Sequence, residues 1–99
     1  MLVARRYRVR GRVQGVGFRY FVERVALREG LHGWVRHAAD GTVEIEVEGE
    51  AEAMARFEAH VSGGPPGARV DEVQMDEGVP HGRATGFMTR SSEARGERL

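Results

Sequence analysis

A short segment near the N-terminus, Gln14-Gly15-Val16-Gly17-Phe18-Arg19, combines two glycines with an arginine that closes it. A glycine-bearing turn that leads into a helix points several backbone N–H groups into one concavity, and the helix dipole adds to the attraction for an anion. The guanidinium of Arg19 can bond two phosphate oxygens at once. The segment therefore predicts a phosphate-binding loop with Arg19 as its side-chain ligand.

Other glycine-containing motifs fit this segment less well. It lacks the Gly-Lys-Ser/Thr ending of a P-loop, and Tyr20 stands where a dinucleotide fingerprint needs a glycine. The aromatic residues of 17–22 resemble an RNA-recognition motif, but that motif belongs on an interior strand, whereas this segment opens a helix. A tight turn without a ligand is the remaining alternative.

The spacing of apolar residues shows which elements must position the loop. Alternation of apolar and polar residues predicts strands, and apolar residues three or four apart predict helices. The order of these elements is that of the split βαβ, or ferredoxin-like, α+β fold. We expect strands at 3–13, 31–37, 42–48, 69–77 and 83–90, and helices at 19–29 and 50–61.

Two motifs resemble those of a known family. Residues 11–19, Gly-Arg-Val-Gln-Gly-Val-Gly-Phe-Arg, resemble the acylphosphatase signature Gly-Arg-Val-Gln-Gly-Val-x-Phe/Tyr-Arg, and residues 33–44 resemble a second block of that family, with Trp34 and the Asp40-Gly41 turn in place. The resemblance covers roughly residues 4–90. It implies a βαββαβ sandwich in which a four-stranded antiparallel sheet carries two helices on one face.

The resemblance also implies roles for individual residues. The loop Gln14, Gly15, Val16, Gly17 and Phe18 would hold the phosphate together with Arg19, and the residue at position 37 would orient the attacking water. The family has Asn there, whereas this chain has His37 and contains no Asn. Because a neutral imidazole has one donor and one acceptor nitrogen, His37 can position a water as a carboxamide does.

The implied activity is hydrolysis of small acyl phosphates to a carboxylate and inorganic phosphate by direct in-line attack of water. The protein would position the reactants and stabilise negative charge, with no cofactor and no metal. Arg19 and His37 are then the catalytic candidates, and inorganic phosphate is expected to be both product and inhibitor. The alternative is a weakly active or inactive phosphate-binding module, because His37 replaces the water-orienting Asn.

Composition limits the remaining classes of function. The chain has 99 residues, a formal net charge of zero and no Cys, which predicts one domain at 1–90, followed by a polar and mobile tail at 91–99. Neutral charge argues against a nucleic-acid partner, and no apolar run approaches the ~20 residues of a membrane span. We therefore expect a cytoplasmic monomer. The other histidines are scattered without carboxylates at ligand spacing, which argues against a metal site.

Charged residues recur at every second position of two predicted strands. Arginines occupy positions 6, 8, 10 and 12, and glutamates occupy positions 44, 46 and 48. The implied topology makes these strands neighbours, so that the two rows face each other on the side of the sheet without helices. We expect a solvated ladder of ion pairs there and not a nucleic-acid patch.

Overall fold

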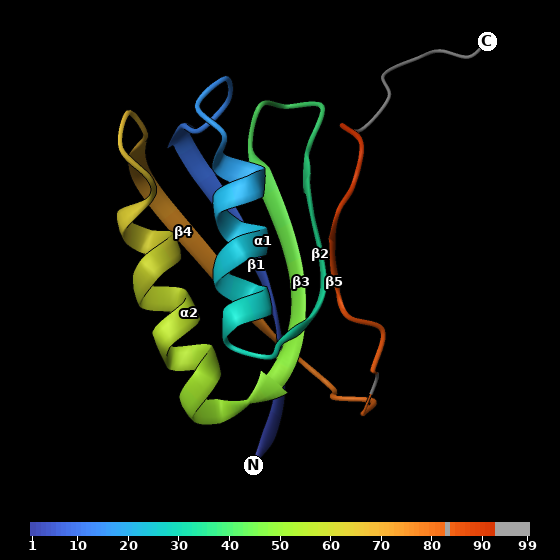
Figure 1. Ribbon diagram of the computed structural model, residues 1–99. Coiled ribbons are helices and arrows are strands. Elements are labelled where there is room, and N and C mark those ends of the chain that lie inside the picture. Colours follow the sequence, from blue (N-terminus) through green and yellow to red (C-terminus); the bar gives the residue numbers. More distant parts are fainter. Residues whose placement is uncertain (83, 93–99) are drawn as a thin grey trace, which may run out of the picture.

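The computed structural model describes residues 1–82 and 84–92, which contain five strands and two helices (Figure 1). Six elements begin and end within two residues of the predicted bounds, whereas the last strand is shorter than expected. The part of the predicted tail from residue 93 onward lies outside the described residues. In chain order the elements are β1 (Leu2–Arg12), α1 (Phe18–Arg28), β2 (His32–His37), β3 (Val43–Glu50), α2 (Ala51–Gly63), β4 (Arg69–Gly78) and β5 (Phe87–Thr89).

The strands form one sheet in the order β4-β1-β3-β2-β5. The first four are antiparallel neighbours, and β5 pairs in parallel with β2. The prediction of a four-stranded, fully antiparallel sheet is therefore wrong: the sheet has five strands, and β5 runs parallel to β2. The predicted α+β arrangement is confirmed. Since β4 and β5 lie at opposite edges of the sheet, the chain crosses from one edge to the other between them, and the alternation of apolar and polar residues in β5 alone could not show that.

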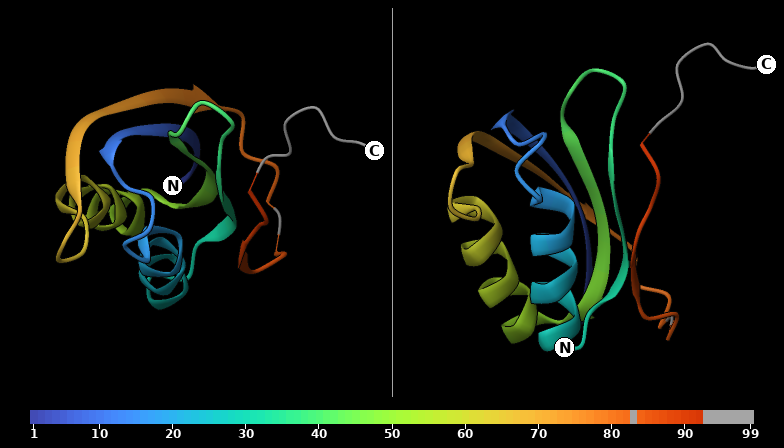
Figure 2. Two further views of the ribbon diagram at one scale, coloured as in Figure 1. Left: turned by 90° about the horizontal axis from the view of Figure 1, so that it is seen from above. Right: turned by 45° about the horizontal axis from the view of Figure 1, so that its top comes forward.

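Both helices pack on the same face of the sheet (Figure 2). The core between the two layers is apolar, and its burial provides the main driving force for folding. Gly30, at φ +71°, ends α1 as expected from glycine's tolerance of the left-handed region. The core residues include Tyr7, Val9, Phe18, Val22, Val25, Val35, Val43, Ile45, Met54, Phe57, Val61 and Phe87.

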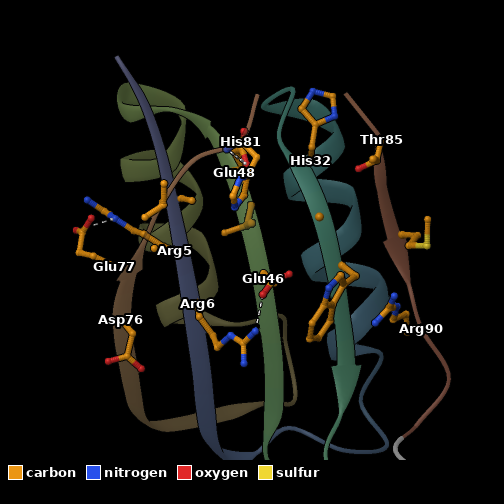
Figure 3. A pocket seen from close by; sticks show the side chains of 17 residues that line it. Arg5, Arg6, His32, Glu46, Glu48, Asp76, Glu77, His81, Thr85 and Arg90 are labelled. Carbon is orange, nitrogen blue, oxygen red and sulfur yellow. Dashed lines mark hydrogen bonds and ion pairs between the residues drawn. The ribbon is translucent and has the colours of Figure 1, made fainter. Parts of the chain in front are cut away.

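The opposite face of the sheet carries the predicted ion-pair ladder. Arg6 pairs with Glu46, an ion pair drawn in Figure 3, and its Nη2 lies 2.5 Å from Glu46 Oε2. Arg8 Nη2 lies 2.5 Å from Glu44 Oε2. Glu44 also accepts a hydrogen bond from Arg36 Nε at 2.9 Å. The ladder is not fully solvated, however, because Glu44 is only 8% exposed. Two arginine side chains cover it.

A second buried carboxylate, Glu48, holds the crossover between β4 and β5. It accepts hydrogen bonds from the backbone N–H groups of His81 and Gly82, and it is 7% exposed. Nearby, Gly86 N donates to His32 Nδ1 at 2.9 Å. The crossover is therefore fixed to the sheet. It borders a hollow of about 710 Å³ on the helix-free face (Figure 3).

Candidate active site

The predicted phosphate loop connects β1 to α1 at one end of the sheet (Figure 1). Gly15 and Gly17 have φ values of +74° and +72°, a region that other residues rarely adopt. Left-handed residues in such a turn allow successive N–H groups to converge on one point. The N-cap of α1 is Gly17, which makes no side-chain capping hydrogen bond to the first N–H groups of the helix. This arrangement suits an anion.

Side chains on both sides of the loop hold it in place. Phe18 is 1% exposed and lies in the core, and Val16 packs partly buried against the same core. A Cβ placed on Gly41 would lie 3.7 Å from Gln14 Nε2, so the loop approaches the β2–β3 turn. The predicted loop residues therefore form one segment at the surface that is anchored to the core by Val16 and Phe18.

Arg19 lies in the first turn of α1 and reaches the end of β5. Its Nη1 atom donates a hydrogen bond of 2.6 Å to the backbone oxygen of Arg90. A shallow hollow of about 540 Å³ begins beside Arg19, between α1 and the end of β5, and is lined by Tyr20, Glu23 and residues 89–92. The arginine is therefore half-buried at the edge of an open, polar hollow.

His37 is the last residue of β2, and the positive charge of Arg19 acts on its ring. Burial lowers the pKa of His37, the positive charge of Arg19 lowers it further, and a hydrogen bond to the backbone of Val13 opposes both. A hydrogen bond that raises a histidine pKa is one that the ring donates, so the nitrogen facing Val13 carries the proton. The other nitrogen, Nε2, is buried and has no hydrogen-bond partner among the described residues. The two catalytic candidates thus lie within range of each other's electrostatic influence.

The turn after His37 is fixed by its own hydrogen bonds. The Ala38 N–H donates to Thr42 O at 2.8 Å, and Asp40 accepts from the backbone N–H and the hydroxyl of Thr42, at 3.0 and 2.7 Å. These two bonds hold the pKa of Asp40 below its ordinary value. Arg8 donates to both Asp40 and Thr42. His37 therefore precedes a rigid turn, and Arg8 and Thr42 are contributors that the sequence analysis did not identify.

Two residues of the β5 region were also missed. Thr89 is the last residue of the three-residue strand β5, and Arg90 follows it; this strand is too short to show an alternation of apolar and polar residues.

Among the described residues, no group of three or more His, Cys, Asp or Glu is arranged to hold a metal ion. No helix in that part of the chain is long and apolar enough to span a membrane. The larger hollow on the helix-free face contains neither Arg19 nor His37.

Comparisons with known proteins agree on one family. The acylphosphatase family model matches residues 5–89. An acylphosphatase of Koribacter versatilis is 45% identical over 84% of this chain and 76% of its own length, and one of Thermotoga maritima is 48% identical over 80% and 88%. The crystal structure of acylphosphatase from Bacillus subtilis superposes with a TM-score of 0.85 at 40% identity, over 91% of this chain and 99% of that one. The chain therefore belongs to the acylphosphatase family.

Proposed function

We propose that this protein is an acyl phosphate hydrolase that cleaves the bond between phosphorus and the acyl oxygen to release a carboxylate and inorganic phosphate. The observation that carries the proposal is a left-handed glycine loop at a helix N-terminus, with Arg19 in the first turn of that helix and His37 within reach of its charge, in a member of this family. A mixed anhydride is already activated. Positioning and charge stabilisation therefore suffice as the protein's contribution.

The phosphate group is held by the loop and by Arg19. Backbone N–H groups from Gln14 to Phe18 surround its oxygens, and the Arg19 fork bonds two of them. As the bond to the acyl oxygen breaks, negative charge increases on the leaving carboxylate and is spread over the phosphoryl oxygens. Donors fixed in advance by Phe18 and by Arg90 O stabilise this charge without having to reorganise.

His37 orients the attacking water. Its proton faces Val13, so Nε2 accepts a hydrogen bond from the water and leaves an oxygen lone pair free for phosphorus. A buried acceptor without a partner costs about 1–3 kcal/mol. A water bound there removes that cost. In this mechanism His37 stays neutral, and a phosphate oxygen takes the proton that the water releases.

The alternative, a phosphate-binding module with weak activity, follows from the presence of His at a position where the resemblance implies Asn. Turnover of benzoyl phosphate by wild type, His37→Asn and His37→Ala decides between the two. If the protein is a hydrolase, His37→Ala should lower kcat and leave the inhibition constant of inorganic phosphate unchanged. His37→Asn should have a kcat equal to or higher than that of wild type. Equal low rates in wild type and His37→Ala would favour the binding module.

Further properties follow from the same assignment. Inorganic phosphate should inhibit competitively, because it fits the loop that holds the substrate's phosphoryl group. EDTA should leave the rate unchanged, since the proposed ligands of the phosphate are Arg19 and N–H groups.

We also propose a monomer, because one copy of the chain supplies every group assigned here. Light scattering tests that point. The cytoplasmic location stays a prediction.

A further inference from the structure

Two buried polar atoms near Arg19 have no hydrogen-bond partner among the described residues: His37 Nε2 and Thr89 Oγ1. A third such atom, Arg5 Nε, lies 3.5 Å from a carboxylate oxygen of Glu77 and so still has an ion-pair partner. Buried polar groups in native proteins are almost always paired. Two unpaired atoms in one region therefore need an explanation.

The register of the sheet places these two residues on the same face. Thr89 in β5 lies opposite Val35 in the parallel strand β2, and Val35 precedes His37 by two residues. Residues two apart on a strand point to the same side, and Val35 is fully buried in the core beneath the helices. Thr89 and His37 are therefore diagonal neighbours that both face α1.

Arg19 approaches both residues from α1. It lines the shallow hollow together with Thr89, and it donates a hydrogen bond to Arg90 O, one residue further along the chain. Its charge also acts on the His37 ring. Arg19 is thus linked to Thr89 by the hollow that both residues line, and to His37 by its charge.

The chemistry of the two unpaired atoms is complementary. His37 Nε2 can only accept, because the ring proton faces Val13, whereas the Thr89 hydroxyl can both donate and accept. One water between them would donate to Nε2 and accept from the hydroxyl. A second lone pair of its oxygen remains for phosphorus. Two partners are also the minimum that holds a buried water in place.

We propose that Thr89 is a second water-holding residue, and that its hydroxyl and His37 Nε2 hold the nucleophilic water between them beside Arg19. The inference rests on the proposed hydrolase function. In the step, a bond forms between the water oxygen and phosphorus while the bond from phosphorus to the acyl oxygen breaks. The acyl group leaves as a carboxylate with the electron pair of that bond. One water proton stays on the new phosphate oxygen, and the other passes to a second phosphate oxygen.

Paired variants at position 89 test this proposal. Thr89→Val keeps the branched shape and removes the hydroxyl, whereas Thr89→Ser keeps the hydroxyl. With benzoyl phosphate we expect Thr89→Val to lower kcat about tenfold, the effect of one hydrogen bond, with the inhibition constant of phosphate unchanged. Thr89→Ser should restore kcat to within about twofold of wild type. Thr85→Val, an exposed position in the same crossover, is the matched control and should behave as wild type.

Coupling to His37 provides the second test. In a His37→Ala background the shared water has already lost one partner, so Thr89→Val should lower kcat much less than tenfold. A full additional tenfold loss there, or wild-type kcat in Thr89→Val, would overturn the proposal. So would failure of Thr89→Ser to restore the rate. An inactive wild-type protein would instead reject the hydrolase assignment itself, which is measured first.

Discussion

The helix-free face of the sheet and the β2–β5 edge on the helix side both contain buried polar groups. Those of the helix-free face have hydrogen-bond partners, whereas two at the edge have none among the described residues. On the helix-free face, Glu44 accepts from Arg8 and Arg36, and Glu48 accepts from two backbone N–H groups of the crossover. On the helix side, at the edge formed by β2 and β5, His37 Nε2 and Thr89 Oγ1 have no partner among the described residues. The two buried carboxylates of the helix-free face are satisfied, whereas these two neutral polar atoms of the β2–β5 edge are not, within the part of the chain that the structure describes.

This difference indicates that the buried carboxylates stabilise the fold, whereas the unpaired atoms serve the proposed reaction. A satisfied carboxylate holds strands and crossover together, and removing it leaves its donors unpaired. An unsatisfied atom makes the fold less stable, and natural proteins retain such atoms mainly where they serve a function. We therefore expect substitutions on the helix-free face to change stability, and substitutions at the β2–β5 edge to change turnover.

The largest expected effect is at Arg19. Arg19→Ala removes the charge and the fork that we propose as ligands of the phosphoryl oxygens. It should lower kcat/KM for benzoyl phosphate about 10²- to 10³-fold and abolish inhibition by phosphate. Arg19→Lys keeps the charge but loses the bidentate geometry, and it should also be strongly impaired. Near-normal turnover and phosphate inhibition in Arg19→Ala would show that the site is assigned to the wrong end of the sheet.

The reverse pattern is expected at Glu44. Glu44→Ala leaves Arg8 and Arg36 without their shared carboxylate, and it should lower the free energy of unfolding by about 1–3 kcal/mol with little change in kcat. Glu72→Ala breaks the exposed pair with Arg10 and is the matched control, with a loss of about 0–1 kcal/mol. Urea denaturation of both variants measures the contrast. A large loss of kcat in Glu44→Ala, with the free energy of unfolding unchanged, would remove the distinction between the two faces.

A smaller effect should separate loop geometry from stability. Gly15→Ala and Gly30→Ala both place a Cβ at φ near +70° with no atom within 4 Å, so each should cost about 1–2 kcal/mol of backbone strain. Only Gly15→Ala should also weaken phosphate inhibition. Gly17→Ala should resemble Gly15→Ala, since its φ is nearly the same. Unchanged phosphate inhibition in both loop variants would argue against a backbone cradle.

The smallest effect is a shift between two pH profiles. In the proposed mechanism His37 acts in its neutral form, and burial and the charge of Arg19 lower its pKa below the ordinary 6.5. The acid limb of kcat/KM, which reports the free enzyme, should therefore lie below that pH. The negative charge of bound substrate raises the pKa of His37, so the acid limb of kcat should lie at higher pH than that of kcat/KM. His37→Asn should lack the limb, and superimposable profiles in both proteins would exclude a role for His37.

The sequence allowed much of the fold and part of the site to be predicted, because both depend on local patterns. Alternation and helical spacing located six elements, and the glycine loop and Arg19 follow from residue type and order. The pairing of β5 with β2 depends on a crossover between opposite edges, which no local period encodes. The burial of Glu44 and Glu48 depends on arginine side chains and backbone from other elements. Thr89, a lone polar residue in a three-residue strand, gives no signal at all.

The short edge strand β5 has a consequence for the order in which the protein matures. Four strands and both helices precede it in the chain and form nearly all of the core, so that core can assemble before β5 docks. The backbone oxygen that holds Arg19, and the hydroxyl of Thr89, arrive only with β5. Local openings cost less free energy than global unfolding and occur most readily at short edge elements. We therefore expect detachment of β5 to remove the partner of Arg19, and with it catalytic activity, before the rest of the core unfolds.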